Sequence, residues 1–178
     1  MNPAFELSEY QRRLTKVRTA MSDKELDALV IGDPANMNWL TGFDAWSFYV
    51  PQVMLVLHDH PPVWLGRQMD AGSVALTTHL GSESVRPYAE DLVQRDGVHP
   101  MNAIGTSLAE FHLEGKRVGF ESDTYFFSFK AVERLQAKLS GAIWVDADRL
   151  VNWWRAVKSD VESEAMRGAA RIASRVMG

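Results

Sequence analysis

The chain contains no cysteine among its 178 residues. Disulfides, thiolate metal sites and a cysteine nucleophile are therefore excluded. Excess charge is also small, because 19 Lys and Arg against 23 Asp and Glu give a formal net charge of −4. The basic residues are scattered along the chain and form no stripe. This distribution gives little support for binding nucleic acid or an anionic membrane, so we expect neither partner.

Long apolar runs are missing as well. No stretch approaches the length that spans a membrane, and the first residues, Met1-Asn2-Pro3-Ala4-Phe5-Glu6, lack the basic and apolar regions of a signal peptide. The expected location is therefore the cytoplasm. Apolar residues make up 46% of the chain, an ordinary value for a globular protein. A chain of this length is most simply one domain that buries roughly 70% of its unfolded surface.

The stretch from Asp33 to Pro51 organises the middle of the chain. Asp33-Pro34 predicts a turn, and a short helix follows with Pro34 in its first turn and Gly42 at its end. Beyond Gly42 the residues become aromatic without helical or strand periodicity. Such a segment is typical of a contact surface, although a loop packed under its own aromatic side chains fits the same pattern.

Elsewhere strands alternate with helices. Short apolar runs predict strands over residues 27–31, 53–57, 62–66, 83–88, 117–121 and 142–145. Helical periodicity and end signals predict helices over residues 8–22, 69–80, 100–115, 128–139 and a short stretch around 150–154. Capping residues are expected at Ser8 with Gln11, and at Asp146 and Asp148. The pattern indicates a three-layer α/β fold, a mixed β-sheet with helices on both faces.

The last residues predict one more helix. Ser159 and Glu162 form a capping box, and an apolar stripe follows at Val161, Ala165, Ala169, Ile172 and Val176. A long amphipathic helix needs a partner, which is either this domain or a second one. We expect the second. Residues 1–157 are then one domain, and residues 158–178 are a linker with the first helix of a catalytic domain that this chain lacks.

Several ordered motifs carry a family resemblance. They are Tyr10-x-x-Arg13-Leu14, Asp27-Ala28-Leu29-Val30, the stretch from Asp33 to Gly42, Arg67, Val118-Gly119-Phe120-Glu121 and the run from Arg155 to Ala170. In order and spacing they resemble the creatinase, aminopeptidase P and prolidase family, in the region before its catalytic domain. The segments Trp46 to Val50, Trp64 to Arg67 and His99 to Met101 are most similar to the ectoine hydrolase branch.

This resemblance implies a ribonuclease-H-like domain that precedes a pita-bread catalytic domain and helps to build a homodimer. It places the catalytic residues in that second domain, so this chain by itself should not catalyse the reaction and should hold no cofactor. A divalent metal is implied in the catalytic domain only if the protein is a peptidase.

The resemblance also implies a binding role for the aromatic segment. In creatinase the matching loop reaches a small-molecule substrate in the neighbouring subunit, where an aromatic ring and an arginine hold the substrate carboxylate. The aromatic position falls on Phe48, but the arginine position falls on Val50, which argues against creatine. An aromatic wall suits the delocalised cation of ectoine. Trp46, Phe48 and Tyr49 are therefore the candidate substrate contacts.

Two classes of function follow. The first is the N-terminal domain of a hydrolase that breaks a C–N bond, with ectoine ring opening preferred and Xaa-Pro peptide hydrolysis as the alternative. The second is a stand-alone binding or dimerisation module.

Other residues have both a functional and a structural interpretation. His58 and His60 could bind a metal ion, but a solvated turn is favoured. Glu121 and Asp123 could form an acid–base pair, but a strand end and a turn are favoured. Arg67 could bind an anion, although pairing with a surface carboxylate is favoured. The adjacent residues Trp153 and Trp154 fit packing between domains.

Overall fold

In the computed structural model, which describes residues 3–45, 47 and 49–178, six strands form one sheet. They are β1 (Ala28–Ile31), β2 (Val53–Leu57), β3 (Val63–Arg67), β4 (Val85–Tyr88), β5 (Arg117–Phe120) and β6 (Ile143–Asp146). Their order across the sheet is β4-β3-β2-β1-β5-β6. Because β1 pairs antiparallel with β2 and parallel with β5, the sheet is mixed, as predicted. The predicted hairpin between β2 and β3 is also confirmed.

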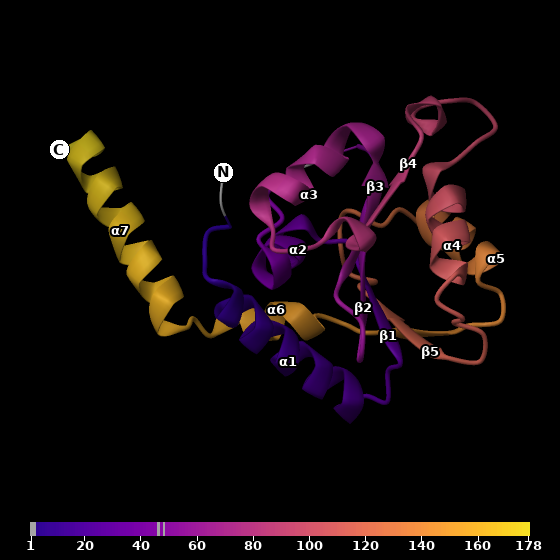
Figure 1. Cartoon of the computed structure of the whole chain (residues 1–178), viewed down its shortest axis with the longest axis horizontal. Helices are drawn as coiled ribbons and strands as arrows, with labels where there is room; N and C mark the ends of the chain where they lie inside the picture. The colour runs from indigo at the N-terminus through magenta and orange to yellow at the C-terminus, as the bar shows by residue number, and fades with distance from the viewer. Residues whose placement is uncertain (1–2, 46, 48) are drawn as a thin grey trace.

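Helices cover both faces of the sheet. The described α-helices are α1 (Leu7–Asp23), α2 (Pro34–Thr41), α3 (Ala71–Thr77), α4 (Pro100–Ala109), α5 (Phe129–Lys138), α6 (Leu150–Ala156) and α7 (Asp160–Met177). Short 3₁₀ turns are η1 (Gln68–Asp70), η2 (Ser82–Ser84) and η3 (Glu90–Leu92). Figure 1 shows α1, α2, α3 and α6 on one side of the sheet and α4 and α5 on the other, which confirms the three-layer α/β fold.

Strand β1 lies at the centre of both cores, and all four of its residues are buried. Ala28 and Val30 belong to the core under α4 and α5, whereas Leu29 and Ile31 belong to the core under α1, α2 and α6. Successive strand residues point to opposite faces, so a short, wholly apolar strand supplies both cores. This confirms the prediction of a buried central strand.

The predicted helix caps have mixed outcomes. Asp33 caps α2 by accepting the Ala35 N–H at 2.8 Å, as predicted. The capping box predicted at Ser8 is wrong, because α1 already begins at Leu7 and its N-cap residue is Glu6. The capping role predicted for Asp146 and Asp148 is also wrong. Asp146 instead accepts the Ser122 hydroxyl and the Asp148 N–H, each at 2.7 Å, so its carboxylate closes a turn before α6.

Three helix predictions need correction. Helix α4 ends at Ala109 and does not continue toward Gly115, because His112 adopts a positive φ of 52°. In α5 the predicted core residue Phe129 is 87% exposed, and Ala131 is buried on the inward face. The helix predicted over residues 69–80 is divided into η1 and α3.

Helix α7 leaves the rest of the fold. Figure 1 shows it projecting from the other layers, with the C-terminus at its far end. Its predicted capping box is present, since Ser159 and Glu162 each bond the other's backbone N–H. None of its residues is buried, and the predicted apolar stripe from Val161 to Val176 lies open on the surface. The stripe therefore does not pack on this domain.

Candidate functional site

The segment after α2 starts from a left-handed turn. Gly42 has a φ of 86°, and a Cβ at this position would lie 2.6 Å from the Thr77 carbonyl oxygen, so only glycine fits. Phe43 follows and is buried, with its ring centroid 5.5 Å from that of Trp64. The Asn38 amide donates to the Phe43 carbonyl at 3.2 Å. Phe43 is thus a core residue, and the contact surface begins beyond it.

The three predicted contact residues lie further along this segment. Trp46 and Phe48 fall outside the described residues. Tyr49 is 63% exposed and stands beside Arg67. The Asp70 carboxylate raises the pKa of the Arg67 guanidinium, and the hydrogen-bonded Tyr49 hydroxyl adds to this shift. The Arg67 guanidinium lies 3.1 Å from the Asp70 carboxylate, which confirms the favoured interpretation that Arg67 pairs with a carboxylate.

Val50 shows why an arginine is absent at that position. It is 4% exposed and belongs to the core under α4 and α5, together with Val53 and Met101. A guanidinium there would be buried among apolar side chains at a cost of several kcal/mol. At Val50 this loop therefore turns inward, whereas at Tyr49 it turns outward.

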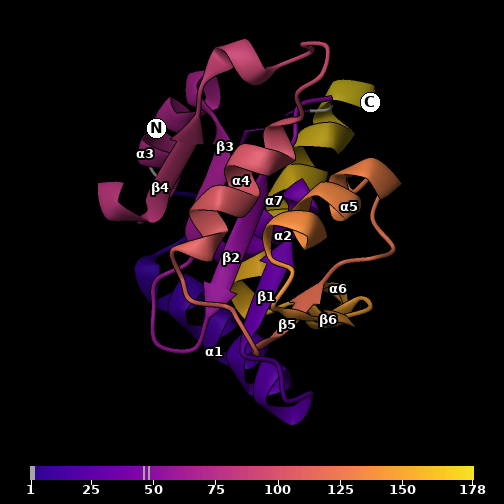
Figure 2. The same cartoon turned by 90° about the vertical axis from the view of Figure 1, so that its right-hand side faces the viewer.

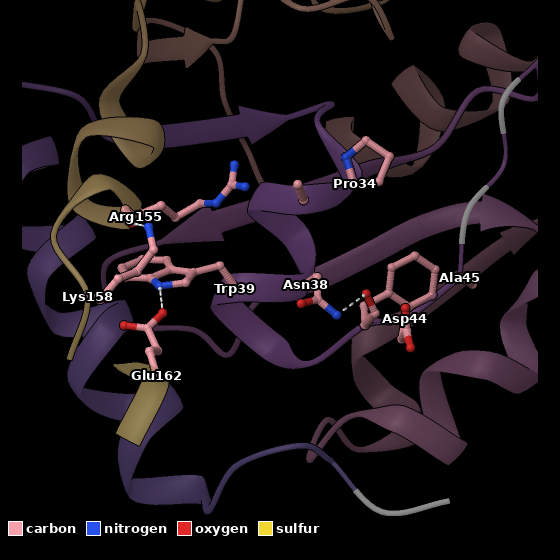
Figure 3. Close-up of a pocket in the computed structure, with 10 residues that line it drawn as sticks. Pro34, Asn38, Trp39, Asp44, Ala45, Arg155, Lys158 and Glu162 are labelled. Atoms are coloured by element: carbon pink, nitrogen blue, oxygen red, sulfur yellow. Dashed lines mark hydrogen bonds between the residues drawn. The ribbon is translucent and has the colours of Figure 1, made fainter. Parts of the chain in front are cut away.

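An open hollow of about 410 Å³ lies where this segment meets the end of the chain. We call it the linker hollow, and it is lined by Asn38, Asp44, Arg155, Lys158 and Glu162 with neighbouring residues. In Figure 3 Arg155, Lys158 and Glu162 lie on one side and Asn38 and Asp44 on the other. Cationic and anionic groups thus share one small surface, which suits a zwitterion better than a single charge.

A buried arginine ties three helices together beside this hollow. Arg13 is 1% exposed; it donates to Glu9 at 2.9 Å and to the Trp39 carbonyl at 2.7 Å, and it lies 3.3 Å from Glu162. Burial alone would raise the pKa of Glu162. Hydrogen bonds from Ser159 and the charge of Arg13 outweigh this effect, so the pKa of Glu162 lies below its ordinary value. Figure 3 shows the Trp39 indole donating to Glu162, at 2.8 Å. This Arg13 cluster anchors the start of α7.

A second polar network joins the strands to α6. Glu121 is 4% exposed and accepts the N–H groups of Gly32 and Asp33, each at 2.9 Å, and the amide of Asn36. Burial raises the pKa of Glu121 to about 7. Asn36 also accepts from Arg155 at 2.6 Å. Glu121 therefore holds the turn between β1 and α2, and Asn36 connects this turn to α6.

The predicted partner of Glu121 lies elsewhere, because Asp123 pairs with Arg149 at the surface. The structural interpretation of the two acidic residues is correct. His58 contacts the Leu26 carbonyl at 2.8 Å, and His60 contacts that of Pro61 at 2.7 Å.

In the described part of the chain, no group of three or more His, Asp or Glu side chains is placed to hold a metal ion. Nor does any helix described here have the length and apolar content needed to cross a membrane.

Comparison with known proteins decides the family. The profile of the Creatinase/Prolidase N-terminal domain matches residues 13–157. The chain belongs to this family. It is 44% identical to an ectoine hydrolase of Halomonas elongata over 169 residues, which cover 94% of this chain and 42% of that protein. It is 38% identical to an uncharacterized hydrolase/peptidase, y4tM, of Sinorhizobium fredii over 174 residues, covering 97% of this chain and 44% of that protein.

A solved Xaa-Pro dipeptidase from Bacillus anthracis has the same fold, with a TM-score of 0.71 and 14% identity over 94% of this chain and 42% of that one. This creatinase/prolidase N-terminal domain thus spans less than half the length of the relatives it matches. In the sequence, Arg13 stood out only as part of a family motif, whereas Glu162 stood out both in a family motif and in the capping box with Ser159. Arg13 lies three residues after Tyr10 and four before Val17, on the apolar face of α1, but periodicity alone does not show that an arginine on that face is buried.

Proposed function

We propose that this creatinase/prolidase N-terminal domain is the non-catalytic front part of a hydrolase that opens the ring of ectoine at a C–N bond. The 44% identity to the Halomonas ectoine hydrolase over 94% of the chain carries this proposal. In that reaction water adds to the ring's amidine carbon and a C–N bond breaks, which leaves an amide and a free amine. Groups outside this chain activate the water, and this chain shapes the pocket.

Residues 158–178 are, in this proposal, the linker and the first helix of the catalytic domain. The exposed stripe of α7 supports this role, because an amphipathic helix gains most of its stability by burying its apolar face. The Arg13 cluster holds the first turn of α7 and so sets the direction in which the chain continues. Any divalent metal of a peptidase-like active site would bind beyond the described residues, which offer no fitting group of ligands.

The aromatic loop is proposed to contact the substrate in a neighbouring subunit of a homodimer. Tyr49 supports this role because it is exposed although the residues on both sides of the segment, Phe43 and Val50, are anchored in the core. A rigidly based loop with an outward ring can reach a second protomer at little entropic cost. Trp46 and Phe48 complete the proposed contact, with aromatic faces that stabilise a delocalised cation.

A chimera tests the proposal. This chain replaces the matching segment of the Halomonas enzyme, and the same segment from the Bacillus creatinase, 26% identical to this chain over 175 residues, serves as control. We expect the first chimera to form a dimer and hydrolyse ectoine and the control to hydrolyse it far more slowly. A folded dimeric first chimera that is no faster than the control contradicts the proposal.

The alternative substrate class is an Xaa-Pro peptide, which the fold shared with the Bacillus anthracis dipeptidase supports. In the same assay an Xaa-Pro dipeptide is supplied with added divalent metal. Faster hydrolysis of the dipeptide than of ectoine by a matching chimera with a dipeptidase catalytic domain would favour the Xaa-Pro substrate.

The other function is a stand-alone binding or dimerisation module. It gains support if the 178-residue chain dimerises through the exposed stripe of α7.

A further inference from the structure

A second open hollow lies between α1 and the turn of the β2–β3 hairpin, and its volume is about 570 Å³. We call it the α1 hollow. Side chains of α1 between Leu7 and Arg18 form one wall, and residues between His58 and Pro62 of the hairpin turn form another. No residue of the described chain lines both this hollow and the linker hollow. Figure 2 shows the opposite face of the sheet, where α4 and α5 lie in front.

Leucine side chains from separate elements give the α1 hollow an apolar lining. Leu7 is 46% exposed at the start of α1, and Leu14, two turns further along the helix, is half-buried. Leu40 at the end of α2 and Leu80 after α3 complete this set. Apolar surface in an open hollow gains free energy when a ligand displaces its water. The lining therefore favours a ligand with an apolar body.

Two opposite charges lie at the hairpin end of the α1 hollow. Arg18 donates to the Leu57 carbonyl at 2.9 Å through Nε and to the His60 carbonyl at 2.5 Å through Nη2. These bonds fix the guanidinium at the turn that contains the exposed Asp59, and neither of them uses Nη1. Burial lowers the pKa of Arg18, and the charge of Asp59 offsets this effect only in part. Asp59 is thus near Arg18, yet no direct ion pair joins the two side chains.

We propose that the α1 hollow binds an apolar α-amino acid, with its carboxylate on Arg18, its ammonium group on Asp59 and its side chain against Leu14. The two charged groups of an α-amino acid share one carbon atom, so they can bridge protein charges that lie close together without touching. A simple carboxylic acid would be repelled by Asp59, and a simple amine by Arg18. A zwitterion with an apolar body matches both charges and the leucine lining. This site does not depend on the hydrolase proposed above.

The test titrates L-phenylalanine into the ¹⁵N-labelled 178-residue chain and follows the backbone signals by NMR. N-acetyl-L-phenylalanine and L-phenylalanine amide are matched controls, because each keeps the apolar ring but lacks one of the two charges. L-alanine keeps both charges but lacks the apolar body. We expect phenylalanine to shift the signals of Leu14 and Asp59 in a saturable manner, and each control to bind at least about ten-fold more weakly. Unmoved signals, or a control that binds as tightly as phenylalanine, would overturn the proposal.

A variant tests the role of Asp59. Asp59→Asn keeps the shape of an exposed side chain but removes its charge, and Asp23→Asn, at the exposed end of α1, is the control for the change in net charge. We expect Asp59→Asn to weaken phenylalanine binding about ten-fold and to bind N-acetyl-L-phenylalanine at least as well as the wild type does, because its carboxylate is no longer repelled. Tm checks that both variants fold. Equal phenylalanine affinities of the two variants would contradict the proposed site.

Discussion

The indole N–H of Trp39 donates to Glu162 at 2.8 Å, across 123 positions of sequence. This bond connects α2, which precedes the aromatic loop, with α7, which leaves the domain. Glu162 also lies 3.3 Å from the buried Arg13. The Glu162 carboxylate thus fixes α2, which precedes the aromatic loop, relative to α7. The mutual orientation of these helices depends on a single polar cluster.

Removing Arg13 should destabilise the domain strongly. In Arg13→Met, Glu9 and Glu162 lose their buried cation, and we expect the free energy of unfolding to fall by about 3 kcal/mol. Arg12→Met is the control, because Arg12 also pairs with Glu9 but its side chain is 43% exposed. It should cost less than about 1 kcal/mol. Urea unfolding of both variants measures the difference, and equal losses would contradict a special role for Arg13.

Removing the Ser159 hydroxyl should loosen the start of α7. Ser159 caps this helix and also donates to Glu9 at 3.1 Å, so Ser159→Ala should cost about 1 kcal/mol. Ser163→Ala, one turn further along, is the matched control. Amide hydrogen exchange across residues 160–165 should accelerate several-fold in the first variant only. Equal exchange rates in the two variants would show that the cap does not hold the helix.

Stability should depend on pH through Glu121. Burial raises its folded-state pKa to about 7, so between its ordinary pKa and about 7 the folded state binds more protons than the unfolded state. The stabilising contribution is complete at low pH and is lost as pH rises through about 7. As the pH rises from about 5 to about 8, the free energy of unfolding of the wild type should therefore fall relative to that of Glu121→Gln. Parallel pH curves would refute this assignment.

The aromatic loop should affect substrate affinity more than stability. In the active chimera, alanine at Trp46, Phe48 or Tyr49 should each raise KM for ectoine about five- to ten-fold, because each removes an aromatic contact with a cation. Phe129→Ala is the control, since Phe129 is 87% exposed on α5. Steady-state kinetics with Tm as a folding check decide the outcome. Tyr49→Ala with unchanged kinetics would remove Tyr49 from the proposed contact.

The sequence predicted turns and helix ends well where the interactions that form them join residues only a few positions apart. The turn at Asp33-Pro34, the glycine at 42 and the capping box at Ser159 and Glu162 are all present. Each depends on neighbours within four positions, so a single sequence contains the required information. The cap predicted at Ser8 failed because the helix begins one residue earlier and takes Glu6 as its N-cap. Phe129 failed as a core residue because Ala131 and Leu135 form the buried face of α5.

The sequence alone thus determined the family, the alternation of strands and helices, and the apolar stripe on the last helix. Only the tertiary structure decided that Arg13 is buried and that Glu121 bonds a backbone turn 88 and 89 positions away. The physical reason is the range of the interactions. Periodicity specifies which face of an element is apolar, but the partners of a polar side chain depend on which distant layers the completed sheet brings together.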